Sequence, residues 1–177
     1  MKLLILDRDG VINQDSSTYI KSPDEWHPVP GSLEAIARFS NAGYRIVVAT
    51  NQSGIARGLF DLETLGAIHA KMHAAAQAAG GRIDAVFFCP HLDSANCDCR
   101  KPKPGLILEI LSRTGAAAAD TVMVGDSLRD LQAGNAAGCR TILVLTGNGT
   151  RTMNNPEFPA DTTVRVDLAA VAAEMLR

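Results

Sequence analysis

The sequence predicts a three-layer, Rossmann-like α/β fold in which helices cover both faces of a central, mostly parallel sheet. Short apolar runs alternate with helical segments along the 177 residues, an order typical of parallel sheets. The first run, Leu3–Leu6, is apolar at every position, as expected for a strand buried on both faces. Carboxylates follow this run directly, and ligands of open α/β sheets bind at the carboxyl ends of the strands.

Apolar patterns and end signals place each element in turn. Buried strands are expected at 3–6, 44–49, 83–89, 121–124 and 141–145, with a short edge strand at 163–166. Helices are expected at 32–41, 62–79, 106–114, 128–137 and 168–176. Asp61 can cap the second helix, and glycines such as Gly43 and Gly80 follow helix ends.

The connecting segments contain no linker and no internal repeat, so we expect a single domain over residues 1–177. Residues 14–30 are polar and irregular and carry the only tryptophan, Trp26. We expect this segment to fold over the mouth of the site. Residues 147–149 are expected to open a further loop.

Composition excludes several classes of protein. The formal net charge is −2 and 46% of the residues are hydrophobic, which argues against a dedicated nucleic-acid binder. No apolar run is long enough to span a bilayer, and the N-terminus lacks a signal-peptide pattern. We therefore expect a cytoplasmic monomer with no membrane or nucleic-acid partner. In that compartment the four cysteines are expected to be metal-bound or free rather than disulfide-bonded.

Asp7 and Asp9 form the first candidate site. They lie two residues apart, so in an extended chain their side chains point the same way, and Gly10 lets the chain turn away. Two close carboxylates are costly unless a cation or a proton offsets them, and Mg²⁺ suits such oxygen ligands. One carboxylate can then attack while the other shuttles a proton. The alternative is an ordinary Asp-rich turn at a strand end.

Polar side chains also follow the second and fourth strands. Thr50 and Asn51 follow one strand, Asp126 follows the other, and Lys101 precedes a helix. A hydroxyl, an amide and a lysine beside a nucleophilic carboxylate suit phosphoryl transfer. Taken singly, each residue has another interpretation: a turn cap at Thr50 and Asn51, a solvated charge at Lys101, or a helix N-cap at Asp126. Asp130 is interpreted as a supporting residue or a surface charge, not a metal ligand.

A cysteine-rich loop at 89–99 suggests a second metal site. Cys89, His91, Cys97 and Cys99 provide a full Cys₃His set, as in structural zinc sites without an open position. The alternative is a loop with free thiols. The remaining cysteine, Cys139, is expected to be a buried core thiol.

Together these motifs resemble the haloacid dehalogenase (HAD) superfamily. The matching residues are Asp7, Asp9, Gly10, Thr50, Lys101, Gly125 and Asp126, in the order of the superfamily's four motifs. The resemblance implies that Asp7 is the nucleophile and Asp9 the general acid/base. It also implies Mg²⁺ held by Asp7, the Asp9 main-chain carbonyl and Asp126, with Thr50 and Lys101 binding the phosphoryl group.

Within this superfamily the sequence resembles the D-glycero-D-manno-heptose 1,7-bisphosphate 7-phosphatases, which have no inserted cap domain. The resemblance lies in residues 7–13, 50–58 and 99–102 and in the cysteine-rich loop at 89–99. This implies removal of the C7 phosphate of a sugar bisphosphate during ADP-heptose synthesis for the lipopolysaccharide core. Two features depart from that pattern. Five residues separate His91 from Cys97, as in histidinol-phosphatases, and Ser127 stands where some heptose enzymes carry lysine.

Histidinol-phosphatase is therefore the main alternative; a polynucleotide 3′-phosphatase or a non-catalytic receiver-like module is a further one. Without a cap domain, loops must close the site. We expect Asp15, Gln52, Ser53 and Arg100 to contact substrate, together with Thr50, Asn51 and Lys101. Arg100 suits the non-reacting phosphate because a guanidinium can bind phosphate with two parallel hydrogen bonds, and Arg57 can assist.

Overall fold

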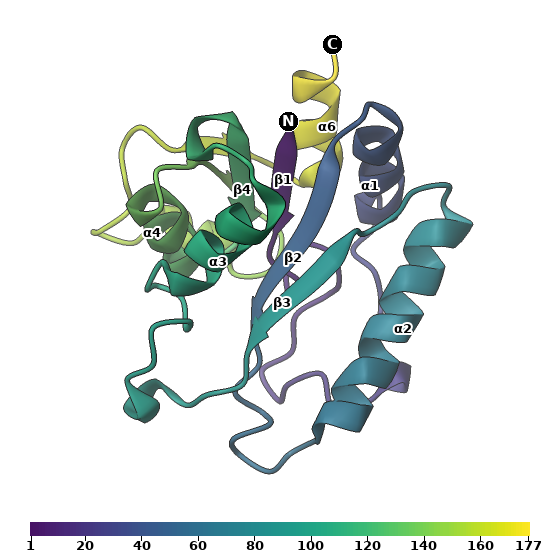
Figure 1. Cartoon of the computed structure of the whole chain (residues 1–177), viewed down its shortest axis with the longest axis vertical. Coiled ribbons are helices and arrows are strands. Elements are labelled where there is room, and N and C mark those ends of the chain that lie inside the picture. The colour runs from purple at the N-terminus through teal and green to yellow at the C-terminus, as the bar shows by residue number, and fades with distance from the viewer.

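A computed structural model describes all 177 residues, and its centre is a six-stranded parallel sheet (Figure 1). The strand order is β3-β2-β1-β4-β5-β6. The strands are β1 (Leu3–Leu6), β2 (Arg45–Asn51), β3 (Ala85–Cys89), β4 (Thr121–Gly125), β5 (Arg140–Val144) and β6 (Thr163–Arg165). Every neighbouring pair is parallel, so all strands present their carboxyl ends at one edge.

Helices cover both faces of this sheet, which confirms the predicted three-layer class. Those of one layer are α1 (Ser32–Asn41), α2 (Leu62–Ala78) and α6 (Leu168–Met175). Those of the opposite layer are α3 (Gly105–Thr114) and α4 (Leu128–Ala136) (Figure 1). A short helix, α5 (Gly149–Met153), follows β5. No domain is inserted between these elements.

Alternate residues of the strands build two separate cores. Leu4 and Leu6 of β1 belong to the core under α1, α2 and α6, whereas Leu3 and Ile5 belong to the core under α3 and α4. All four side chains are fully buried, as required of a strand covered on both faces. The continuous apolar run at the start of the sequence therefore becomes the centre of the sheet.

The predicted element boundaries hold to within two residues, with a few differences. β2 extends to Asn51 because Thr50 and Asn51 pair with Phe88 and Cys89 of β3. The loop expected at 147–149 instead leads at once into α5. That helix has only five residues and no apolar period, so the sequence pattern does not reveal it. Short 3₁₀ turns at 23–25, 93–95 and 118–120 are also absent from the prediction.

The segment 14–30 is fixed to the body of the protein through Trp26, whose side chain is buried in the first core. Lys71 of α2 lies over the Trp26 ring, and its Nζ donates to the main-chain carbonyls of Pro23 and Trp26. This anchor sets the position of the preceding residues, including Asp15, which lines the cavity described below.

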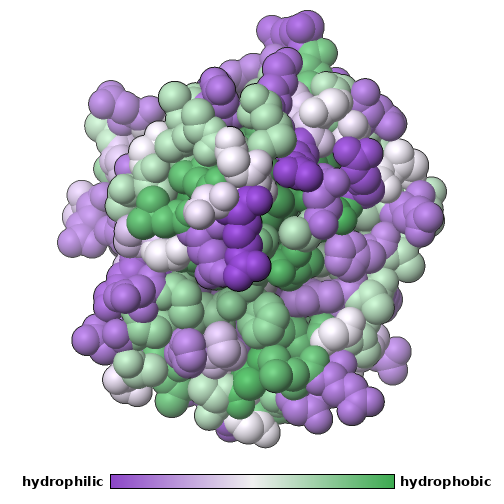
Figure 2. Space-filling view, in the orientation of Figure 1, coloured by the Kyte–Doolittle hydropathy of each residue, from purple (hydrophilic) through white to green (hydrophobic).

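On the face shown in Figure 2, polar and hydrophobic residues are both exposed, and hydrophobic residues adjoin one another over parts of the lower half. The large exposed apolar side chains include Leu59 and Leu62, beside the start of α2. None of the helices combines the length and the apolar character needed to cross a membrane.

Candidate active site

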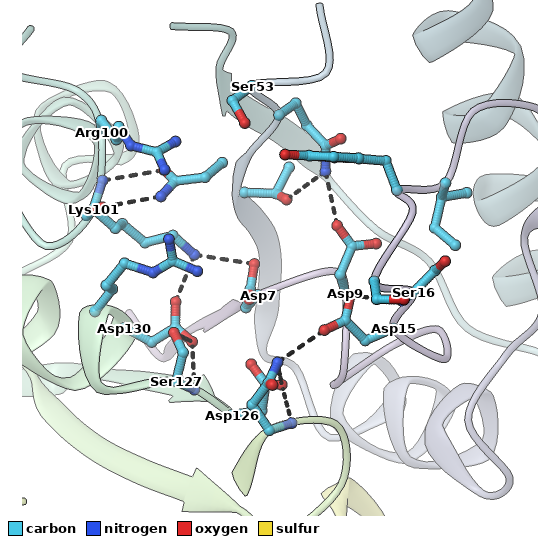
Figure 3. Close-up of a pocket in the computed structure, with 18 of the residues that line it drawn as sticks. Asp7, Asp9, Asp15, Ser16, Ser53, Arg100, Lys101, Asp126, Ser127 and Asp130 are labelled. Carbon is cyan, nitrogen blue, oxygen red and sulfur yellow. Dashed lines mark hydrogen bonds and ion pairs between the residues drawn. The ribbon is translucent and has the colours of Figure 1, made fainter. Parts of the chain in front are cut away.

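A polar cavity of about 380 Å³ lies at the carboxyl edge of the sheet. Asp7 and Asp9 follow β1, Thr50 is the second-last residue of β2, and Asp126 follows β4; all of them line the cavity with Lys101 (Figure 3). All five residues are predicted from the sequence, and the fold brings them together. The predicted contacts Asn51, Gln52, Ser53, Asp15 and Arg100 line the same cavity.

Lys101 occupies the centre of the site. Its ammonium Nζ lies 3.0 Å from Asp7 Oδ1 and 2.6 Å from Asp130 Oδ1, and it donates to the Ala49 carbonyl at 2.7 Å. Burial disfavours this charge, yet the carboxylates of Asp130 and Asp7 outweigh burial and raise the pKa of Lys101. Lys101 is therefore a permanent buried cation, not a solvated surface charge.

Asp130 is buried and belongs to this network, so the interpretation as a surface charge is wrong. Besides binding Lys101, its carboxylate accepts hydrogen bonds from the main-chain N and the Oγ of Ser127. These bonds close a capping box at the start of α4 with Ser127 as N-cap. Asp126 is therefore not the N-cap, and its carboxylate faces the cavity instead.

Asp126 is fixed by the loop after β5. Its Oδ2 accepts from Asn148 N at 2.7 Å, and its main-chain carbonyl accepts from Thr152 Oγ1. Gly10 and Gly147 have positive φ angles of 83° and 57°, and a Cβ on either would lie within 2.2 Å of Asp126 Oδ2. Burial and the carboxylate of Asp130 raise the pKa of Asp126 to about 7. The site thus concentrates more negative charge than Lys101 neutralises.

The surroundings of Asp7 carry the same excess of negative charge. Burial and the Asp130 carboxylate raise its pKa well above the ordinary value, against the lowering effect of Lys101. One oxygen each of Asp7, Asp126 and Asp130 lie within 4.8 Å of one another, and the Asp9 main-chain carbonyl accepts no hydrogen bond. A hard divalent cation fits this oxygen-rich set. Both oxygens of Asp130 already bind Lys101 and Ser127, whereas Asp7 Oδ2, the Asp126 carboxylate and the Asp9 carbonyl contact neither.

Asp9 has a different environment from Asp7. Its Oδ1 accepts from Arg8 Nε, Arg8 Nη2 and Asn13 Nδ2 at 3.1, 2.8 and 2.9 Å, and its Oδ2 accepts from Gln52 Nε2 at 3.0 Å. Burial opposes ionisation, but the Arg8 charge and these hydrogen bonds outweigh it and lower the pKa of Asp9. The two carboxylates are therefore electrostatically distinct, as a nucleophile and a proton shuttle need to be.

Asn51, the last residue of β2, and Gln52, which follows it, position their neighbours. Gln52 Nε2 also donates to Thr50 Oγ1, which leaves the Thr50 hydroxyl hydrogen free for a ligand. Asn51 donates to the Lys101 carbonyl and accepts from the Lys101 main-chain N, at 3.0 and 3.1 Å. The Asn51 side chain thus holds Lys101 in place, and its predicted contact with substrate stays a prediction.

Arginines surround the outer part of the cavity. Arg100 contacts the cysteine-rich loop at 89–99, where its Nη1 donates to the His91 carbonyl. Arg57 lies over the Tyr19 ring at 5.8 Å and lines the cavity. Arg129, from the first turn of α4, also lines the cavity, although no sequence motif predicts it. Arg8 and Asn148 are not predicted either, because their partners His69 and Asp126 are distant in sequence.

The loop after β3 brings its four predicted ligands together. Cys89 Sγ lies 3.5 Å from His91 Nδ1 and 3.6 Å from Cys97 Sγ, and Cys99 Sγ lies 3.4 and 3.7 Å from His91 Nδ1 and Cys97 Sγ. Sulfur ligands of a tetrahedral zinc ion, each about 2.3 Å from the metal, lie at similar separations. Cys139 is buried in the second core, as predicted.

Relatives of known name match this chain over most of its length. D-glycero-β-D-manno-heptose-1,7-bisphosphate 7-phosphatase of Bordetella bronchiseptica is 56% identical over 177 residues, covering 100% of this chain and 99% of the relative. The protein of that name from Neisseria meningitidis is 55% identical over 166 residues, covering 93% and 89%. The chain belongs to the heptose 1,7-bisphosphate 7-phosphatase family.

Two further comparisons agree. A family profile described as HAD-hydrolase-like matches residues 98–171. The crystal structure of D,D-heptose 1,7-bisphosphate phosphatase from B. bronchiseptica, complexed with magnesium and phosphate, superposes with a TM-score of 0.97 and covers 99% of this chain and 98% of that one. The predicted HAD membership is confirmed, and this member of the family is a phosphatase.

The contact between Gly10 and Asp126 yields a prediction. In Gly10→Ala, the new Cβ would meet Asp126 Oδ2, so we expect kcat/KM to fall by at least about 100-fold, as for other displacements of site groups by about 1 Å. Gly43→Ala is the matched control: its φ is 82°, but a Cβ there meets nothing within 4 Å. Both variants bear the same backbone strain, so equal activity in the two would contradict a role for the Gly10 contact. The measurement is steady-state kinetics beside thermal unfolding.

Proposed function

We propose that this protein removes the C7 phosphate of D-glycero-D-manno-heptose 1,7-bisphosphate in the synthesis of ADP-heptose for the lipopolysaccharide core. The observation that carries the proposal is the full-length identity of 56% to a heptose bisphosphate phosphatase, joined to a site with Asp7, Asp9 and Lys101 in one cavity. The β-anomer in the names of the relatives supports the β-bisphosphate as substrate.

In the first chemical step, an oxygen of Asp7 attacks phosphorus while the bond to the C7 oxygen breaks. The leaving oxygen takes the bonding pair and a proton from Asp9. The pKa of Asp9 is lowered in the free protein. A bound phosphate dianion adds negative charge beside Asp9, which favours the protonated form needed in this step.

In the second step, Asp9 accepts a proton from water as the water oxygen attacks phosphorus, and Asp7 leaves as a carboxylate. Lys101 and the Thr50 hydroxyl stabilise the charge on the phosphoryl oxygens. Asp7, Asp126 and the Asp9 carbonyl would hold Mg²⁺, which when bound neutralises charge on the transferring group. The 56% identical structure complexed with magnesium and phosphate supports Mg²⁺ as the metal.

This mechanism predicts the effect of removing each carboxylate. Asp7→Asn removes the attacking charge and Asp9→Asn the proton donor, so we expect turnover to fall by about 10⁴-fold and about 10²–10⁴-fold, respectively. Asp24→Asn, on an exposed 3₁₀ turn, is the control and should keep wild-type turnover. Acid-quench trapping of phosphoenzyme checks the order of events. Near-wild-type turnover in pure Asp7→Asn protein would rule out the aspartyl-phosphate route.

The second metal in the proposal is structural Zn²⁺, held by Cys89, His91, Cys97 and Cys99. Three thiolates and one imidazole leave no open position for chemistry. Arg100 and Lys101 follow the last ligand, Cys99, directly. The zinc ion with its four ligands, here called the zinc clip, would therefore fix the two cationic residues that line the cavity.

Metal analysis tests this clip. Protein purified without chelator should contain about one zinc per chain. Cys97→Ser should release most of it and lower both the melting temperature and substrate affinity, since removing one ligand weakens a structural zinc site. Cys139→Ser, at the buried thiol outside the loop, should keep the zinc. Absence of zinc from wild-type protein would contradict the clip directly.

Substrate choice depends on the second phosphate. Arg100 has a mostly buried side chain and faces the cavity, and its single ion pair, with Asp93, spans 3.9 Å. It is therefore available to a phosphate that lies away from Asp7. Histidinol-phosphatase is the alternative function, favoured by the five residues between His91 and Cys97. A monophosphate would leave the Arg100 contact unused and lose binding energy.

The ratio of kcat/KM for heptose 1,7-bisphosphate to that for histidinol phosphate tests this choice. We expect the ratio to exceed about 100 in the wild type, since a buried charge-assisted contact contributes about 1.5–3 kcal/mol. Arg100→Ala should reduce it by about tenfold or more. Arg100→Lys keeps the charge but cannot form two parallel hydrogen bonds with phosphate. Its ratio should therefore lie between those of the wild type and Arg100→Ala. A ratio that favours histidinol phosphate would overturn the substrate, and one unchanged by Arg100→Ala would overturn the role of Arg100.

We also propose that residues 1–177 act as one domain, in the cytoplasm and as a monomer, without a membrane or nucleic-acid partner. The single sheet that carries all catalytic residues supports the one-domain arrangement.

A further inference from the structure

The side chain of Arg8, between the two catalytic carboxylates in sequence, is completely buried. Its Nε and Nη2 both donate to Asp9 Oδ1, at 3.1 and 2.8 Å, and its Nη1 lies 3.2 Å from His69 Nε2. A guanidinium has only donors, so His69 Nε2 accepts this hydrogen bond and the ring proton resides on Nδ1. The hydrogen bonds from Arg8 to His69 and to Asp9 thus link α2 to Asp9, the proposed proton shuttle.

His69 is suited to accept this bond. It lies on the buried side of α2 with only 8% of its surface exposed, and its ring lies beside the Phe88 ring of β3. Burial, the Arg8 charge and His73 lower the pKa of His69 to about 4. The imidazole is therefore neutral at neutral pH and keeps its lone pair for Arg8.

The two oxygens of Asp9 are left in unequal situations. Oδ1 accepts from two nitrogens of Arg8 and from Asn13 Nδ2, whereas Oδ2 accepts only from Gln52 Nε2. A proton on Oδ1 would have to displace one of three donors. Oδ2 has a free lone pair, and Asp9 lines the cavity.

We propose that His69 is a positioning residue that acts through Arg8 to orient Asp9, so that Oδ2 is the oxygen that gives and takes the proton. In the first step, the C7 oxygen keeps the electron pair of the broken P–O bond and takes the proton from Oδ2. In the second, Oδ2 takes a proton from the attacking water while the bonding pair of the acyl phosphate returns to Asp7. Asp9 ends the cycle protonated, as it began.

A purely structural role for His69 is the competing explanation, because its loss would leave Arg8 Nη1 buried without a partner. That role predicts lower stability with equal effects on all substrates. A positioning role predicts an effect that depends on the leaving group. An aryl phosphate such as p-nitrophenyl phosphate releases a weakly basic phenolate that needs no proton, whereas a primary-alcohol phosphate does need one.

The experiment compares kcat/KM for both ester types in four variants of the full chain. His69→Phe removes the acceptor and keeps a ring, and His69→Gln restores an acceptor oxygen. His73→Phe is the control on the same helix, one turn further and exposed. Met72→Ala controls for stability alone, since Met72 is a fully buried apolar residue of α2 that belongs to the first core.

We expect His69→Phe to lower kcat/KM for heptose 1,7-bisphosphate by about tenfold or more, part of the 10²–10⁴-fold contribution of general acid catalysis. For p-nitrophenyl phosphate, kcat/KM should change by less than about twofold, because this parameter reports the step that needs no acid. His69→Gln should recover part of the loss. Met72→Ala should lower the melting temperature without altering the ratio between the esters, and His73→Phe should alter neither.

The second step supplies a readout independent of the heptose substrate. With p-nitrophenyl phosphate, His69→Phe should release a burst of nitrophenol followed by slow turnover, because water activation still requires Asp9. The inference rests on the proposed role of Asp9, and Asp9→Asn measured in parallel separates the two. An intact Asp9→Asn enzyme would reject the proposed mechanism. A crippled Asp9→Asn enzyme beside a His69→Phe variant with equal losses on both esters and no burst would reject only the positioning role.

Discussion

The buried ammonium of Lys101 is the contact on which the rest of the site depends. It joins Asp7 after β1, the Ala49 carbonyl of β2 and Asp130 on α4, so one cation connects three elements at the edge of the sheet. Removing one partner of a buried ion pair costs about 3–5 kcal/mol, because the remaining charge is left without compensation. The Asn51 side chain holds the Lys101 backbone through two hydrogen bonds.

The arrangement around Lys101 gives chemically similar carboxylates different tasks. Asp7 and Asp126 lie where burial and Asp130 raise their pKa values, so a cation is needed to keep them ionised together. Asp9 faces Arg8, Asn13 and Gln52 instead, and its pKa is lowered. A short stretch of chain thus carries two carboxylates in different environments, because the fold supplies different partners to each, and this difference suits the two roles that we propose for them.

Polar contacts outside the predicted motifs hold this geometry. Asn148 donates to Asp126 Oδ2 and also to Asp15 Oδ2, the latter at 2.8 Å, so the loop after β5 connects Asp126 to the segment 14–30. Gly10 and Gly147 allow that loop to approach Asp126 closely. The site is closed by loops fixed to the body of the protein, consistent with the absence of an inserted domain.

The sequence by itself determined the sheet, the order of the helices and the residues that meet at its edge. The hydrophobic period and the residues that begin and end helices and strands are local features of the sequence. Parallel strands in one sheet bring their carboxyl ends to the same edge, so Asp7, Thr50 and Asp126 were predictable as neighbours. Tertiary structure alone decided the partners of the buried charges. Arg8 meets His69 and Lys101 meets Asp130 across 61 and 29 positions of the chain, and no local pattern encodes which distant side chain compensates a charge once water is excluded.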